Sequence, residues 1–290
     1  MSIQTLVEKI KEKGNPTVAG LDARLEYIPQ HISGRNMMLH GETLRAAAES
    51  VVAFNCGLID ALCDIVPAVK PQAAYYELLG SYGAMALKET IDYAHAKGMY
   101  VIGDIKRNDI GATASAYAEA YLCKTRAGAT EIAPYGCDSV TVNGYLGTDG
   151  VEPFLKECRS REKSLFLLVK TSNPSSGELQ DQKMESGKTV YETMGEFCEH
   201  WGESVMGKYG YSGVGAVVGA TYPAQLGEMR EKAPHTFFLV PGYGAQGGGA
   251  DDVAPAFDKN GLGAIINSSR GIMCAWRKEK CDEHDYAQAA

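Results

Sequence analysis

Short apolar runs alternate with longer amphipathic stretches along most of the chain. The runs contain many β-branched residues, and they cover 17–22, 67–70, 100–106, 139–144, 165–172, 214–220, 236–242 and 263–270. Between them, as in 44–65 and 81–98, apolar residues recur at i, i+3 and i+4, which predicts helices; the second of these ends on Gly98, a residue suited to terminate a helix. Apolar runs of this kind are typical of parallel strands that helices cover on both faces. The pattern therefore predicts an α/β protein.

Eight strand–helix units in roughly 250 residues fit a (β/α)₈ barrel, the TIM barrel, better than an open doubly wound sheet. No Pro-, Gly- or Ser-rich linker and no sequence repeat divides the chain, so we expect a single domain over residues 1–290. Two connections are long: 23–43 after the first strand and 173–190 after the fifth. In a barrel such connections lie on the face where ligands bind, although a tolerated surface insertion is an alternative for the first.

Polar side chains stand where the apolar runs end. They are Asp22, Lys70, Asp104, Lys106, Asn143, Ser172 and Arg270. The carboxyl ends of all strands of a parallel barrel meet at one face. We therefore expect these side chains to face one cavity.

The segment 104–109 places Lys106 between Asp104 and Asp109. Asp104 and Lys106 are two residues apart on a strand, so their side chains share a face. A simple ion pair, with Asp109 capping the helix predicted over 110–122, is one interpretation. Lys70 from the neighbouring strand would add a second cation. Two Lys and two Asp in balance can hold a lysine protonated and directed at a reacting atom.

A Gly-rich loop, 241–252, follows the seventh strand, and "SSRG" follows the eighth. The glycines alone would be explained by flexibility, but these two loops form the usual phosphate site of a barrel. Gln246 and Arg270 would supply side-chain donors, and Ser269 and Gly271 would add backbone N–H groups.

Composition narrows the possible partners. The chain is 45% hydrophobic and 22% charged with a net charge of −8, and it has no basic run, which argues against a nucleic-acid-binding protein. The eight Cys form no C-x-x-C pair, and neither a signal peptide nor a membrane-length apolar run is present, so we expect free thiols in a soluble, cytoplasmic protein with no membrane partner. The six His lie away from the predicted strand ends, and Lys70 stands where a carboxylate would be needed for a Mg²⁺ site; no metal is expected.

Taken together, these segments resemble the longer branch of the orotidine 5′-phosphate decarboxylase family. The matching motifs follow in the family's order over nearly the whole chain: "AGLDAR", "AVKPQAAYYE", "GDIKRNDIGATA", "DSVTVNGYLGTDGVEPF", "LLVKTSNPSSGELQ", "VPGYGAQGG" and "SSRGI". The D-x-K-x-x-D element alone is also found in phosphosugar decarboxylases and hexulose-phosphate synthases. The resemblance implies a carboxy-lyase of pyrimidine biosynthesis that converts orotidine 5′-phosphate to UMP without a cofactor, on a TIM barrel that forms a homodimer.

The resemblance also implies roles for the catalytic residues. Lys106 is similar to the lysine that protonates C6 of the pyrimidine, and Asp104 to the carboxylate that faces the departing CO₂. Asp109, with Ile110 and Thr113, resembles a segment that enters the partner's active site.

The remaining matches concern the substrate. Lys70 and Asp22 match residues that bind ribose hydroxyls and complete the charge network, and Ser172 matches a serine that hydrogen-bonds the pyrimidine. Gln246 and Arg270 match the phosphate-binding pair, and Pro241 and Ser269 belong to the same two motifs and are expected to contact substrate. No role follows for Asn143. The two long connections depart from the shorter members of the family.

Three alternatives stay open at this stage. A metal-dependent phosphosugar decarboxylase or aldolase can use the same barrel, although Lys70 in place of an acidic residue disfavours it. A Schiff-base aldolase would use Lys106 or Lys70. A catalytically silent nucleotide-binding barrel would not need Asp104, Lys106 and Asp109 together.

Overall fold

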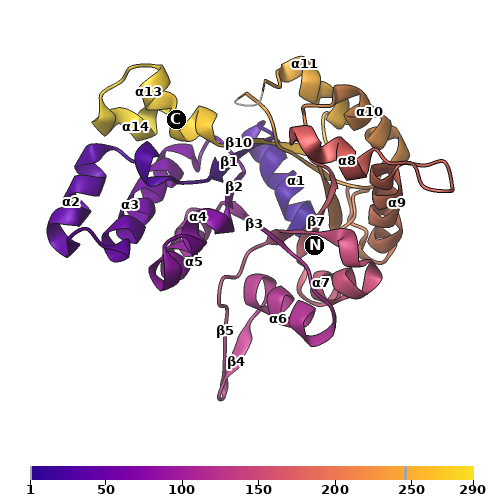
Figure 1. Ribbon diagram of the computed structural model, residues 1–290, viewed down its shortest axis with the longest axis horizontal. Helices are drawn as coiled ribbons and strands as arrows, with labels where there is room; N and C mark the ends of the chain where they lie inside the picture. Colours follow the sequence, from indigo (N-terminus) through magenta and orange to yellow (C-terminus); the bar gives the residue numbers. More distant parts are fainter. Residues whose placement is uncertain (1, 245–246) are drawn as a thin grey trace.

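The computed structural model describes residues 2–244 and 247–290. Eight parallel strands close into a barrel in the order β1-β2-β3-β6-β7-β8-β9-β10, with helices around it (Figure 1). The strands are β1 Thr17–Leu21, β2 Ala68–Pro71, β3 Tyr100–Arg107, β6 Ser139–Val142, β7 Ser164–Lys170, β8 Val214–Val218, β9 Phe238–Val240 and β10 Ala264–Ser268. Each lies within or next to one of the eight apolar runs, so the predicted fold class is confirmed.

The α-helices follow the alternation that the sequence predicts. They are α1 Ser2–Lys13, α2 Gln30–His40, α3 Leu44–Leu62, α4 Ala73–Glu77, α5 Gly80–Ala96, α6 Gly111–Leu122, α7 Thr148–Arg161, α8 Gly177–Gln180, α9 Val190–Gly202, α10 Pro223–Lys232, α11 Ala250–Val253, α12 Arg270–Met273, α13 Ala275–Lys278 and α14 Tyr286–Ala289. Short 3₁₀ helices are η1 Leu25–Tyr27, η2 Gly144–Leu146, η3 Pro174–Ser176, η4 Glu203–Val205, η5 Ala254–Ala256 and η6 Glu283–Asp285. Within the described ranges, none of the helices is both long and apolar enough to cross a membrane.

Two hydrophobic cores hold the barrel together. The larger core lies between the strands and the outer helices, and the smaller core fills the barrel interior. Helix α1 closes the interior at one end, because its buried residues Ile3, Leu6 and Val7 pack with strand residues such as Phe166. Ser2 anchors the helix by hydrogen bonds to the hydroxyls of Tyr100 and Ser164. The interior is therefore filled from the end where the strands begin, and polar side chains are left to gather where the strands end.

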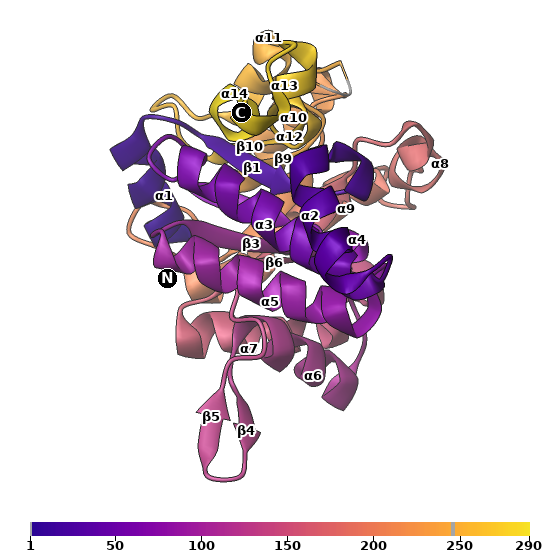
Figure 2. The same cartoon turned by 90° about the vertical axis from the view of Figure 1, so that its left-hand side faces the viewer.

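Several elements were not visible in the apolar pattern. The connection 23–43 contains helix α2, which packs against α3 without burying any residue fully. The connection 173–190 contains η3 and α8. A two-stranded hairpin, β4 Thr125–Ala127 and β5 Thr130–Ile132, projects from the barrel (Figures 1 and 2), and all of its strand residues are exposed. These elements carry little buried apolar surface, and a pattern of burial cannot reveal them.

Candidate active site

Two adjoining cavities open at the end of the barrel where the strands finish. The first, of about 340 Å³, we call the polar cavity; the second, of about 430 Å³, we call the mixed cavity. The polar cavity is lined by Asp22, Arg24, Tyr27, Lys70, Gln72, Tyr75, Asp104, Pro241, Gly242, Tyr243, Asn267, Ser269 and Arg270. The mixed cavity is lined by Lys70, Asp104, Lys106, Thr141, Leu168, Thr171, Ser172, Asn173, Gln180, Val217, Leu239 and Pro241. Because Lys70, Asp104 and Pro241 line both, the two cavities form one two-part site.

Three charged side chains stand where the cavities meet, and we call Lys70, Asp104 and Lys106 the Lys–Asp–Lys cluster. Lys70 Nζ lies 2.6 Å from Asp104 Oδ2, and Lys106 Nζ lies 2.5 Å from Asp104 Oδ1. Asp22 adds a second carboxylate, 3.9 Å from Lys70 Nζ. Lys70 and Asp104 are almost fully buried, whereas the Lys106 side chain is 44% exposed. The cluster thus has a buried ion pair, Lys70 with Asp104, and one half-exposed cation, Lys106, that lines the mixed cavity.

Two neutral side chains complete the surroundings of Asp104. Gln72 Nε2 donates to Asp104 Oδ2 over 2.9 Å, and the Thr141 hydroxyl donates to Oδ1 over 2.8 Å. With the two lysines, both carboxylate oxygens are satisfied. The position of the carboxylate is therefore set before any ligand binds.

Burial and charge act in opposite directions within the cluster. Burial by itself raises the pKa of Asp104, but the adjacent charges of Lys70 and Lys106 outweigh it and hold that pKa well below its usual range. Burial lowers the pKa of Lys70, and the carboxylates of Asp104 and Asp22 outweigh this effect, so the net shift is upward. Asp104 is therefore an anion and Lys70 a cation at neutral pH.

Lys106 departs from regular strand geometry. Its φ of +50° lies in the left-handed region, and the register between β3 and β6 shifts between Gly103 and Arg107. Its backbone N–H donates to the Thr141 hydroxyl over 3.0 Å, which supports this conformation. A non-glycine residue in this region costs about 1–3 kcal/mol, a strain that is typical of functional sites. Asp104 and Lys106 do meet at the mouth, but a twist of the chain brings them together and not simple alternation along a strand.

The mixed cavity combines an apolar floor with a polar rim. Leu168, Val217 and Leu239 form the floor, and the rim includes Ser172 and Gln180. Ser172 sits close to the end of β8 because residue 219 is glycine: a Cβ atom there would lie 2.9 Å from Ser172 Cα. This arrangement suits a flat ring with polar groups at its edge.

The polar cavity lies under the loops after β9 and β10. Pro241, Ser269 and Arg270 line it, as the loop sequences predict. Gly242 and Gly244 have φ values of +101° and +72°, which explains glycine at these turns. Gln246, the other expected phosphate donor, lies outside the described residues.

Three residues chosen from the sequence lie elsewhere. Asp109 accepts a hydrogen bond from the Ile110 backbone N–H over 2.8 Å, and Thr113 is exposed on α6; neither lines the two cavities. The second carboxylate near the lysines is Asp22 and not Asp109. The expectation that Asn143 faces the cavity is wrong, because its side chain turns to cap η2 and accepts from the Tyr145 N–H over 3.0 Å.

Sequence reasoning also missed residues that the structure brings into the site. Gln72 follows Lys70 by two positions and so shares its face, a signal that was available. Thr141 is the one hydroxyl flanked by valines in the "SVTV" strand. Gln180 gave no such signal, because it reaches the mixed cavity from a long connection.

The fold and the site define an enzyme of the TIM-barrel class with a charged cluster at its mouth. The sequence profile described as "Orotidine 5'-phosphate decarboxylase / HUMPS family" matches residues 51–280. The chain belongs to this family.

Relatives of the chain support the same assignment. It is 46% identical to "Orotidine 5'-phosphate decarboxylase" of Rhodopirellula baltica over 97% of this chain and 92% of that protein. The solved structure of Leishmania donovani OMP decarboxylase is 30% identical with a TM-score of 0.73, and the match covers 100% of this chain and 99% of that one. Leishmania donovani UMP synthase is 31% identical with a TM-score of 0.75, but the match spans 98% of this chain and only 56% of that longer chain.

Proposed function

We propose that this protein converts orotidine 5′-phosphate to UMP, the last step of de novo pyrimidine nucleotide synthesis, without a metal or organic cofactor. The Lys–Asp–Lys cluster between the polar and mixed cavities is the observation that carries the proposal. The eight cysteines of the chain are free, which suits a reducing compartment, and on that ground we place the enzyme in the cytoplasm.

The two cavities match the two ends of such a nucleotide. The pyrimidine fits the apolar floor of the mixed cavity, with Ser172 at its polar edge. The phosphate lies toward Ser269 and Arg270 in the polar cavity, with Gln246 as a further expected donor. The ribose then spans the junction, within reach of Lys70 and Asp22.

Charge in the cluster explains how the C6–carboxylate bond breaks. A substrate carboxylate about 4 Å from Asp104 is repelled by roughly 4 kcal/mol at an effective dielectric constant near 20. Departure of CO₂ relieves this repulsion and leaves an electron pair at C6. Lys106 stabilises that charge and donates a proton from Nζ to C6. Because Lys106 is half exposed, solvent can then return a proton to its amine.

Neither effect suffices alone, because enzymes generally lower a barrier by about 8–23 kcal/mol. Binding of the remote phosphate supplies the rest, since its binding energy can offset the free-energy cost of placing the substrate carboxylate beside the Asp104 carboxylate.

Replacing Arg270 by Ala tests the phosphate end. We expect kcat/KM for orotidine 5′-phosphate to fall about 10²-fold, because a charge-assisted bond to phosphate is lost. Steady-state kinetics on Arg270→Ala and on the control Arg159→Ala, which removes a surface ion pair with Glu152, would measure this. An unchanged kcat/KM in Arg270→Ala would refute the phosphate assignment.

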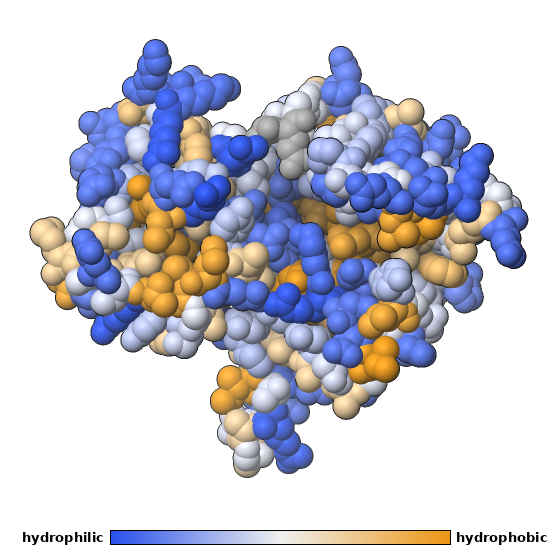
Figure 3. Space-filling view, in the orientation of Figure 1, coloured by the Kyte–Doolittle hydropathy of each residue, from blue (hydrophilic) through white to orange (hydrophobic). Residues whose placement is uncertain are grey.

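We further propose a homodimer in which Asp109 and Thr113 enter the partner's site. Both lie outside the cavities of their own chain. Ile110, which follows Asp109, is 56% exposed, and Leu78, which follows Glu77, is 73% exposed. An ion pair between Arg107 and Glu77 holds α4 beside the end of β3 and so brings these segments together. Figure 3 shows hydrophobic surface over α4 and its neighbours. Exposed apolar patches of this kind commonly mark protein interfaces.

A mixture of two inactive variants tests this arrangement. Lys106→Ala and Asp109→Ala should each be nearly inactive alone. Dissociated together and reassociated, they should recover roughly a quarter of wild-type activity, because half of the dimers are hybrids with one intact site of two. No recovery, or full activity of a monomer at assay concentration, would contradict the shared site.

A further inference from the structure

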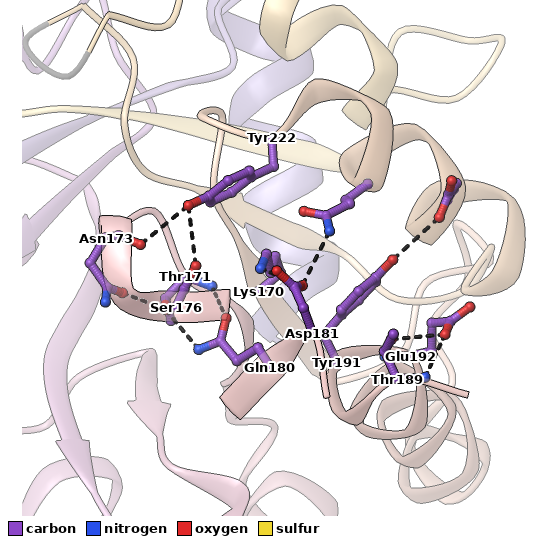
Figure 4. Close-up of polar contacts among 12 residues, drawn as sticks. Lys170, Thr171, Asn173, Ser176, Gln180, Asp181, Thr189, Tyr191, Glu192 and Tyr222 are labelled. Atoms are coloured by element: carbon purple, nitrogen blue, oxygen red, sulfur yellow. Dashed lines mark hydrogen bonds and ion pairs between the residues drawn. The ribbon is translucent and has the colours of Figure 1, made fainter. Parts of the chain in front are cut away.

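Lys170, at the end of β7, is a fully buried lysine that lines neither cavity. Its Nζ lies 2.6 Å from Asp181 Oδ1 and 4.5 Å from the centre of the Tyr222 ring, with the Tyr191 ring at 5.7 Å (Figure 4). Aromatic faces attract a cation, so the ammonium has favourable neighbours besides the carboxylate. The mechanism above leaves this buried charge without a role.

The partner of Lys170 belongs to the long connection 173–190. Asp181 follows α8 directly, and its Oδ1 also accepts from Gln225 Nε2 over 3.2 Å. This connection has little apolar anchorage: Ser176 is its one buried residue, and 181–188 are all exposed. The ion pair with Lys170 therefore attaches the end of α8 to the barrel, beside the hydrogen bonds that Gln180 makes to Thr171.

The residue before Asp181 reaches the mixed cavity. Gln180 Oε1 accepts from the Thr171 N–H over 2.9 Å, and Gln180 Nε2 donates to the Thr171 hydroxyl over 2.8 Å. The Tyr222 hydroxyl bonds the Asn173 carbonyl over 3.4 Å (Figure 4). Gln180, Thr171 and Asn173 all line the mixed cavity, so one set of contacts fixes this wall.

We infer that Lys170 is a positioning residue: through Asp181 and α8 it holds the wall of the mixed cavity against which the pyrimidine binds. The inference rests on the proposed function for the identity of the ligand. Lys170 is buried, whereas the Asp181 side chain is 40% exposed. Burying a charged lysine for such a pair adds little stability over an apolar residue of similar size, so the pair is better explained by the fixed arrangement that it imposes.

The test compares Lys170→Met, the double variant Lys170→Met/Asp181→Asn, and the control Lys188→Met. Lys188 lies in the same connection but pairs with Glu196 at the surface. The double variant removes both charges, so neither is left without its partner. It therefore shows whether an effect of the single variant comes only from misfolding. Calorimetry with UMP and with ribose 5-phosphate measures binding with and without the base, and hydrogen exchange of 171–182 measures the order of the wall.

In both Lys170 variants we expect UMP to bind about tenfold more weakly, a loss of binding free energy comparable to that of roughly one hydrogen bond. Binding of ribose 5-phosphate should be unchanged. KM should rise more than kcat falls, and exchange in 171–182 should quicken. The control should match the wild type in each measurement.

Wild-type UMP affinity and exchange in both Lys170 variants would overturn the inference, as would an equal loss for the two ligands. A wild-type protein that neither binds UMP nor decarboxylates its precursor would contradict the proposed function instead; the exchange measurement would then decide alone whether Lys170 orders this wall.

Discussion

Replacement of Lys106 by Met is expected to lower kcat by about 10⁴-fold or more, since in the proposed mechanism it removes both the general acid and the cation that stabilises charge at C6. Lys106 is the half-exposed member of the Lys–Asp–Lys cluster and lines the mixed cavity. Lys70 remains to hold Asp104, so the fold and the phosphate end should persist. The variant should therefore still bind UMP, and its loss of activity should appear as a lower kcat.

Lys106→Arg separates the two contributions of the lysine. Arginine keeps the positive charge but does not release a proton near neutral pH. Its kcat should therefore lie between those of wild type and Lys106→Met. Lys88→Met is the matched control, because Lys88 pairs with Asp92 at the surface of α5. A Lys106→Met variant with kcat within tenfold of wild type would refute the assigned role.

Asp104→Asn is expected to lower both activity and stability. The substitution removes the charge that both lysines share and leaves buried Lys70 with Asp22 at 3.9 Å as its remaining carboxylate. Loss of one partner of a buried ion pair costs about 3–5 kcal/mol of unfolding free energy. In the proposed mechanism the variant also loses the repulsion between Asp104 and the substrate carboxylate, so kcat should fall about 10³-fold. Urea unfolding at neutral pH and steady-state kinetics measure the two losses.

The pH dependence of that stability has a defined sign. The folded pKa of Asp104 is lowered, so its ionisation stabilises the fold fully above the ordinary aspartate pKa of about 4. The contribution is lost as pH falls from there toward the lower folded pKa. The difference in unfolding free energy between wild type and Asp104→Asn should thus be greatest at neutral pH and shrink at pH 3. Asp92→Asn, in the exposed pair with Lys88, should show almost no difference. A difference that grows in acid would contradict the charge assignment.

Much of the barrel was predictable because its strands are buried on both faces. Each apolar run became a strand, and the convergence of Asp22, Lys70 and Asp104 follows from parallel strands that end together. The helix α2 and the β4–β5 hairpin were not predictable from burial, since their side chains contribute little to either core.

The site was harder to predict in detail. The positive φ of Lys106 depends on the register shift against β6, which no local pattern encodes. Asn143 directly follows β6, as Asp22 directly follows β1, yet the chain turns at once and the Asn143 side chain caps η2. Lys170 ends its strand in the same way, but it points to α8 and not to the mouth. A residue at the end of a strand can be predicted to lie at the face of the barrel where the strands end. The turn that follows the strand determines in which direction its side chain points.

The most direct test follows the absorbance of orotidine 5′-phosphate with purified wild-type protein in EDTA, beside Lys106→Met. The account predicts that wild type removes the substrate spectrum at the same rate with and without EDTA, and that the variant leaves it unchanged on that timescale. Activity that disappears in EDTA would favour a metal-dependent phosphosugar enzyme on the same barrel. No conversion by the wild type under either condition would contradict the proposed decarboxylation.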